Sequence, residues 1–378
     1  MQVPEGTHLR LFCSQIQRSR TGITWDLQIR TIPYTPTMKP IHLLVFAVLI
    51  SGVLCQFDYF SYIGFHDPAY LAQLPFPVCS VECDCPVDFP SAMYCHNRKM
   101  KAIPDVPAEI KYLYLQNNQL TSIPNGAFEN ATNLQWLVLD DNQITNSKIG
   151  KKAFAKLKSL KRLYMNKNNL TEVVHNLPKS LVELKLSSNK ISKIGNSLRG
   201  LENLTTLVLE DNKLTDVGGA LNNLKSLTYL DLSMNELTKL PDELPPALEM
   251  FYLDHNYIES IPKDYFTKGS LQHLRMAHNK ITDKGIPDKV FNITTLIELD
   301  LAFNRLRSIP VVNENLENLY LQANKIQKFT LNSFCRITGT EDFSKINHLR
   351  LDGNNITYDS LPLDMSQCLR LASVMIIN

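Results

Sequence analysis

Six cysteines in the later part of the chain are the residues best suited to covalent or metal chemistry. Four of them follow the pattern C-x3-C-x-C-x9-C and two lie near the C-terminus: Cys79, Cys83, Cys85, Cys95, Cys335 and Cys368. Structural zinc sites usually draw their thiolates from C-x-x-C pairs, and the chain has none. We therefore expect disulfide bonds, and neither a metal ion nor another cofactor.

Other side chains favour covalent modification over catalysis. Tyr59 and Tyr62 lie beside Asp58 in the segment QFDYFSY, which predicts tyrosine sulfation. His273 and His278 have no candidate nucleophile near them in the sequence, and no glycine-rich phosphate loop is present, so we expect no enzymatic activity. Five N-x-S/T sequons predict N-glycosylation, at Asn130, Asn169, Asn203, Asn292 and Asn355.

The front of the chain carries the pattern of an export signal. An apolar run, Ile41–Leu54, follows a lysine and ends at Cys55. This predicts a signal peptide over 38–55, behind an unstructured upstream extension over 1–37. It also predicts that 56–78 is a flexible arm carrying the two tyrosines. The run is too short to span a membrane, so we expect a secreted protein with no membrane partner. The even number of remaining cysteines suits that compartment.

The overall charge is close to zero. The chain has 39 Lys plus Arg and 37 Asp plus Glu, and removal of the first 55 residues leaves 34 and 35. Such a balance gives no reason to expect a dedicated polyanion partner, and we expect no binding to nucleic acid.

A repeated frame organises most of the chain. The pattern L-x-x-L-x-L-x-x-N-x-L occurs eleven times between Ile110 and Ile356, and a degraded copy follows at 371–378. Each copy predicts a short strand with inward leucines, and an Asn whose amide bonds the backbone of its own turn and of the neighbouring turn. One copy cannot bury its apolar face alone, so the copies must stack. The sequence therefore predicts a leucine-rich repeat solenoid of the α/β type, a curved horseshoe with a parallel β-sheet on its concave side.

The side chains between the inward leucines face the concave surface. In the middle copies these are Glu210, Asp211, Asp231, Met250, Tyr252, Asp254, His255, His273, Arg275, His278, Glu298, Asp300 and Phe303. An acidic trough with aromatic side chains suits an extended partner that carries Lys or Arg. The alternative is that some carboxylates are merely solvated, because the concave surface is wet.

Several segments resemble one extracellular family. The cysteine pattern, PSAMYC at Pro90–Cys95, YLYLQNNQL at Tyr112–Leu120 and the long penultimate repeat resemble the small leucine-rich repeat proteoglycans over about residues 56–378. The resemblance implies a Cys-rich N-terminal cap over 79–109, repeats over 110–326, and an ear repeat with a C-terminal cap over 327–378. The disulfide pairing that it implies is Cys79 with Cys85, Cys83 with Cys95, and Cys335 with Cys368.

The same resemblance implies a function in the matrix. Members of this family bind fibrillar collagen through the concave face and restrain fibril growth, and members of this class carry keratan sulfate on N-linked glycans. We therefore expect a secreted keratan sulfate proteoglycan that binds fibrillar collagen, with type I expected, and regulates fibril assembly and diameter. The collagen contacts predicted from the concave positions are Asp254 first, then Asp231, Glu210, Tyr252 and Arg275.

Two alternatives stand beside this expectation. Leucine-rich solenoids also serve as soluble adaptors that bind chemokines, microbial lipids or innate-immune receptors, and fold alone does not exclude that role. A homodimer through the concave faces would cover the predicted collagen contacts. We expect Asp254→Asn to weaken collagen binding and to leave the melting temperature unchanged.

Overall fold

One short strand from each repeat builds a single parallel sheet. The computed structural model describes residues 79–266, 269–335 and 343–376, and in these residues thirteen strands pair in chain order from β1 to β13. The strands are β1 Ala92–Tyr94, β2 Tyr112–Tyr114, β3 Trp136–Val138, β4 Arg162–Tyr164, β5 Glu183–Lys185, β6 Thr206–Val208, β7 Tyr229–Asp231, β8 Met250–Tyr252, β9 His273–Arg275, β10 Glu298–Asp300, β11 Asn318–Tyr320, β12 His348–Arg350 and β13 Ser373–Met375. The predicted leucine-rich solenoid is thereby confirmed.

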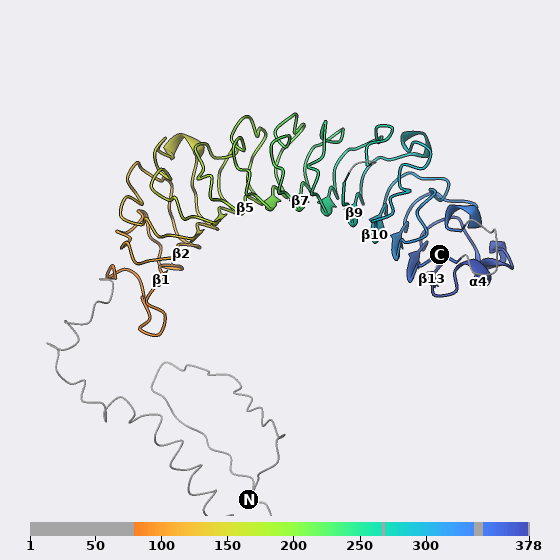
Figure 1. Cartoon of the computed structure of the whole chain (residues 1–378), viewed down its shortest axis with the longest axis horizontal. Helices are drawn as coiled ribbons and strands as arrows, with labels where there is room; N and C mark the ends of the chain where they lie inside the picture. The colour runs from red at the N-terminus through yellow and green to blue at the C-terminus, as the bar shows by residue number, and fades with distance from the viewer. Residues whose placement is uncertain (1–78, 267–268, 336–342, 377–378) are drawn as a thin grey trace, which may run out of the picture. The chain divides into compact units, whose positions relative to one another are not determined.

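Packing behind the sheet accounts for the curvature of this unit, in which the strands lie on the inner side of the arc (Figure 1). The middle residue of β2 to β12 is fully buried, as Leu113 is in β2. Adjacent strands lie about 4.8 Å apart. On the convex side, phenylalanines of successive repeats stack with ring centroids 6.3 Å apart, in the pairs Phe128–Phe154 and Phe266–Phe291. Because the outer spacing exceeds the inner one, each added repeat bends the stack toward the sheet.

A ladder of buried asparagines ties the repeats together. Asn235 is representative: its Nδ2 donates to the carbonyls of Leu232 (3.1 Å) and Ser233 (3.0 Å) in its own turn and of Leu209 (2.9 Å) in the preceding repeat. Its Oδ1 accepts from the backbone N–H of Leu214 at 3.0 Å. Each such side chain satisfies buried backbone groups of two repeats, which confirms the role predicted for the framing Asn.

The residue before each ladder asparagine adopts a left-handed backbone conformation. From Asn117 to Ala323 these residues have φ between 50° and 55°, and in the last full repeat the position is taken by Gly353. Side chains as large as those of Met234 and Phe303 occupy this conformation, which non-glycine residues rarely adopt. The turn before each ladder asparagine is therefore imposed by the stacked repeats and not by local preference.

Disulfides close both ends of the stack. Cys79 pairs with Cys85 and Cys83 with Cys95, and β1 of this N-terminal cap pairs with β2. Cys335 pairs with Cys368 across the segment that contains β12. These are the pairs that the family resemblance implied.

The connections on the convex side contain little regular helix. They include the 3-10 helices η1 Asn146–Lys148, η2 Asp283–Gly285, η3 Leu331–Ser333 and η4 Tyr358–Ser360. In the part of the chain that the structure describes, α-helix is confined to α4, Met365–Cys368. No helix among these residues is long and apolar enough to cross a membrane. The predicted extension 1–37, signal peptide 38–55 and arm 56–78 with Tyr59 and Tyr62 lie outside the described residues.

Candidate concave-face binding site

The strand register aligns the concave side chains in two rows. One row runs from Tyr229 through Met250 and His273 to Glu298, and the other from Asp231 through Tyr252 and Arg275 to Asp300. Because the strands are parallel and in register, neighbours within a row are one strand spacing apart. The rows thus bring side chains that are about 20 residues apart in sequence into direct contact.

A hollow of about 480 Å³ lies on this surface over β7 to β10. All five predicted collagen contacts line it: Glu210, Asp231, Tyr252, Asp254 and Arg275. Tyr229 and Asp300 line it as well, although the sequence did not single them out as contacts. Both occupy the strand positions that flank the inward leucine, so the repeat frame contained the signal that places them there.

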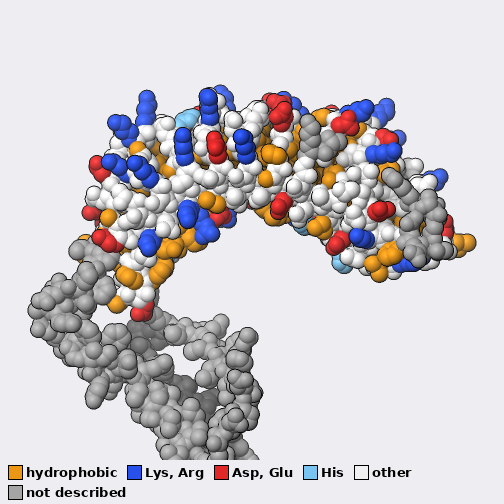
Figure 2. Space-filling model, in the orientation of Figure 1, with side chains coloured by type: hydrophobic (Ala, Val, Ile, Leu, Met, Phe, Trp, Pro, Cys, Tyr) orange, Lys and Arg blue, Asp and Glu red, His pale blue; other side chains and the backbone are white. Residues whose placement is uncertain are grey.

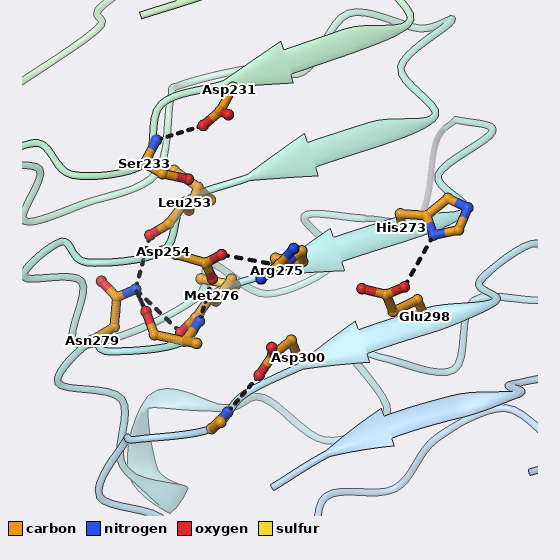
Figure 3. Close-up of polar contacts among 12 residues, drawn as sticks. Asp231, Ser233, Leu253, Asp254, His273, Arg275, Met276, Asn279, Glu298 and Asp300 are labelled. Atoms are coloured by element: carbon orange, nitrogen blue, oxygen red, sulfur yellow. Dashed lines mark hydrogen bonds and ion pairs between the residues drawn. The ribbon is translucent and has the colours of Figure 1, made fainter. Parts of the chain in front are cut away.

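The three aspartates of the hollow are held by backbone N–H groups (Figure 3). Asp231 accepts from the N–H of Ser233 at 2.9 Å and Asp300 from that of Ala302 at 2.9 Å, each two residues further along its own turn. Asp254 instead accepts from the N–H of Ala277 in the next repeat at 2.7 Å. The carboxylates are therefore fixed in position before any partner arrives.

Arg275 lies among these carboxylates. Its Nε is 3.2 Å from Oδ2 of Asp254, in an ion pair whose angle does not meet hydrogen-bond geometry. Its guanidinium carbon is 5.4 Å from the centroid of the Tyr252 ring. Burial acts to lower the pKa of Arg275, but Asp254, Asp300 and Glu298 raise it above the usual value. The lining as a whole holds four carboxylates and this one guanidinium.

Burial raises the pKa of three of these carboxyl groups, those of Asp254, Asp300 and Glu210. It raises the pKa of Asp254 to about 6, against the opposing effects of Arg275 and the Ala277 N–H. It also raises the pKa of Asp300, and that of Glu210, to which the charges of Asp231 and Asp211 contribute. Burial, and to a smaller extent the neighbouring carboxylates, thus disfavour the charged forms of these groups, and a nearby positive charge favours them.

The N-terminal half of the concave face is aromatic. The rings of Tyr94 and Tyr114 stack with centroids 5.0 Å apart, and Trp136 lies 5.9 Å from Tyr114 and 5.5 Å from Tyr164. The Arg162 guanidinium lies 5.0 Å from the Trp136 ring. In Figure 2 hydrophobic side chains gather along this margin with Lys and Arg beside them. The concave face thus differs in chemistry between its two halves.

The sequons lie on the surface of the solenoid. Asn130, Asn203, Asn292 and Asn355 are exposed, and Asn169 is half-buried with its Oδ1 accepting from Nζ of Lys190 at 2.9 Å. Among the described residues, no group of three or more His, Cys, Asp or Glu side chains could hold a metal ion.

Comparison with known proteins first defines the class. Residues 108–170 match the family described as Leucine rich repeat, residues 179–219 and 202–246 match Leucine Rich repeats (2 copies), and residues 270–286 match a further Leucine Rich repeat family. The leucine-rich repeat chain in a solved complex of Latrophilin 3, Unc5D and FLRT2 is 24% identical with a TM-score of 0.58, over 79% of this chain and 92% of that one. An internalin from Listeria monocytogenes is 21% identical with a TM-score of 0.55, over 76% and 82%. These matches define a leucine-rich repeat protein.

Sequence relatives then narrow the class to a family. Lumican from Coturnix japonica is 54% identical over 334 residues, which cover 87% of this chain and 96% of the relative. Human lumican is 50% identical over 337 residues, covering 88% and 98%, and human fibromodulin is 50% identical over 314 residues, covering 82% and 84%. The chain belongs to the lumican and fibromodulin family, the class II small leucine-rich repeat proteoglycans, and is a protein of the extracellular matrix.

Proposed function

We propose that this matrix protein carries keratan sulfate, binds fibrillar collagen through its concave face, and thereby regulates fibril assembly and diameter. The observation that carries the proposal is the hollow over β7 to β10, where four carboxylates and one guanidinium meet on a curved sheet. Membership of this chain in the lumican and fibromodulin family supports the same proposal. The proposal includes no catalytic step.

The hollow offers collagen lysine and arginine side chains two kinds of contact. Asp231 and Asp300 each use one carboxylate oxygen for a backbone N–H, which leaves the second oxygen for a partner. Tyr229 and Tyr252 pack edge to face with centroids 5.3 Å apart beside these groups, and aromatic faces attract cations. A basic side chain of the triple helix can therefore pair with a carboxylate and rest on an aromatic ring.

Glu210 and Asp211 provide a matched pair for the test. They are consecutive acidic residues, but Glu210 lines the hollow and Asp211 is exposed outside it. Removal of one charged contact costs about 1.5–3 kcal/mol, so Glu210→Gln should weaken binding to reconstituted type I collagen fibrils roughly tenfold or more. Asp211→Asn should leave binding unchanged. Turbidity should report slower assembly with the wild-type chain, and electron microscopy thinner fibrils.

The outcomes separate this function from its alternatives. If both substitutions weakened collagen binding equally, binding would depend on the total negative charge of the chain. The hollow would then not be the contact site. If the disulfide-bonded chain failed to bind collagen, the adaptor function would replace the proposal. Light scattering of the free chain tests the homodimer, because a dimer through the concave faces would compete with collagen.

Processing and modification belong to the proposal too. We propose that the mature chain begins at Gln56, that Tyr59 and Tyr62 are sulfated, and that the first four sequons carry keratan sulfate, while Asn355 is an additional glycan site. The exposure of four of the five asparagines supports glycan attachment. Mass spectrometry of the secreted protein, before and after glycan removal, checks each of these sites.

A further inference from the structure

A second hollow, of opposite charge, lies in the turns that follow the strands of the late repeats. It has a volume of about 630 Å³ and is lined by four basic side chains: Lys284, Arg305, Arg307 and Lys325. Those residues follow the ladder asparagines of three successive repeats. All four are exposed. It shares no lining residue with the concave hollow.

The four cations are available to a partner. Within residues 79–266, 269–335 and 343–376, none of them takes part in an ion pair, although arginines elsewhere, such as Arg162 and Arg275, do. Lys280, which directly follows the ladder asparagine of the Lys284 repeat, adds a further positive charge, with its Nζ 4.6 Å from the centroid of the Tyr257 ring. The near-neutral net charge of the chain thus conceals a local concentration of positive charge.

The carboxylate in the lining, that of Asp283, is already engaged by backbone groups. Oδ2 accepts from the N–H of Arg307 at 2.9 Å, and Oδ1 accepts from the N–H of Ser308 at 2.8 Å and from its hydroxyl. Burial acts to raise the pKa of Asp283, but these hydrogen bonds lower it below the usual value. Asp283 therefore fixes the turn that presents Arg307, and the lining keeps an excess of three positive charges.

We propose that this cationic hollow binds a sulfated glycosaminoglycan chain. Basic side chains that recur on three successive repeats suit a polymer with regularly repeated anionic groups. Arginine binds tetrahedral oxyanions with two parallel hydrogen bonds, and two of the four cations are arginines. The partner is thus recognised by charge complementarity at fixed turns.

The composition of the lining selects among polyanions. The remaining side chains are Thr282, Asp283 and Ser308, so the hollow has no apolar side chain for an acyl chain and no aromatic ring for stacking a base. Membrane anchoring needs apolar burial, and single-stranded nucleic acid binding usually uses aromatic stacking. A sulfated polysaccharide needs neither.

The test uses the full secreted chain and a size-defined heparin oligosaccharide, with affinity measured by calorimetry over a range of salt concentrations. We expect saturable binding that weakens with salt. Arg305→Ser with Arg307→Ser should lower the affinity about tenfold. A second double variant, Lys284→Ser with Lys325→Ser, should also lower it. The matched control is Lys151→Ser with Lys152→Ser, which removes the same charge from exposed positions elsewhere and should leave the affinity unchanged.

Each result bears directly on the inference. Loss of binding in the two hollow variants, with unchanged melting temperatures and an unchanged control, supports it. Equal losses in the hollow and control variants would overturn it, since binding would then follow total charge. Equally tight binding of desulfated heparin, phosphatidylserine vesicles or single-stranded DNA would overturn the assignment of the partner. Collagen binding serves as an independent readout, because the hollow variants should retain it.

Discussion

Replacement of Asp254 by Asn tests the electrostatics of the concave hollow most directly. The Asp254 side chain is 14% exposed, and burial raises the pKa of its carboxyl to about 6. An aspartate in an unfolded chain has a pKa of about 3.9. The folded protein thus binds this proton more tightly than the unfolded one. The resulting contribution to stability is fully present below pH 4 and is lost as the pH rises through 6.

The magnitude follows from the size of the shift. A difference of about two pKa units corresponds to about 3 kcal/mol, because each unit is worth 1.36 kcal/mol. Asn cannot ionise but keeps an oxygen for the Ala277 N–H, so Asp254→Asn should remove this pH dependence. Relative to wild type, the variant should gain about 2–3 kcal/mol between pH 4 and pH 7.5, or about 5 °C in melting temperature. This replaces the expectation, drawn from the sequence, of an unchanged melting temperature.

Differential scanning calorimetry at several pH values between 4 and 7.5 provides the measurement. Asp141→Asn is the matched control, since Asp141 is an exposed carboxylate in a left-handed turn position that Asn also tolerates. The control should follow wild type at every pH. A constant difference between Asp254→Asn and wild type across this range would refute the reasoning, because it would mean that the folded carboxyl titrates at its ordinary pKa.

Three further substitutions test the scaffold. Asn235→Ala should destabilise the protein by about 3 kcal/mol or more, because it leaves buried backbone groups of two repeats unpaired; a loss below 1 kcal/mol in denaturant unfolding would contradict the ladder. Gly285→Ala should cost about 1–3 kcal/mol, since a Cβ there would collide with the Glu259 carbonyl; an unchanged melting temperature would count against that packing. Cys335→Ser with Cys368→Ser should cost about 3–4 kcal/mol by opening a loop with a sequence separation of 33; calorimetry giving equal stability would refute a role for the bridge.

The repeat frame predicted what depends on periodicity. It placed the inward leucines, the ladder asparagines and the concave positions of Glu210, Tyr252 and Arg275. These features repeat with the strand, and a side chain on a strand alternates between core and surface regardless of its neighbours. The repeat pattern and the alternation of side chains along a strand were therefore sufficient to predict that the five candidate residues share one surface.

Features that depend on individual turns were not predictable in the same way. Asp231, the last residue of β7, accepts from its own turn, whereas Asp254, two residues beyond the end of β8, accepts from the next repeat. The cationic hollow has no signature in the repeat frame, because its four basic residues belong to turns of unequal length and the summed charge of the chain is small. Contacts between the turns of neighbouring repeats are tertiary properties, which a linear pattern does not encode.

The left-handed position before each ladder asparagine has a consequence for how such surfaces diversify. Asp, Lys, Ser, Met, His, Phe and Ala all occupy it with nearly the same φ. Because the bonds of the following asparagine hold the turn, the conformation does not depend on which side chain stands there. His255, His278 and Phe303 already form a continuous stack along this edge, with centroids 4.0 Å apart. Side chains along this edge can therefore be substituted one repeat at a time, which changes the binding surface and leaves the backbone of the solenoid unchanged.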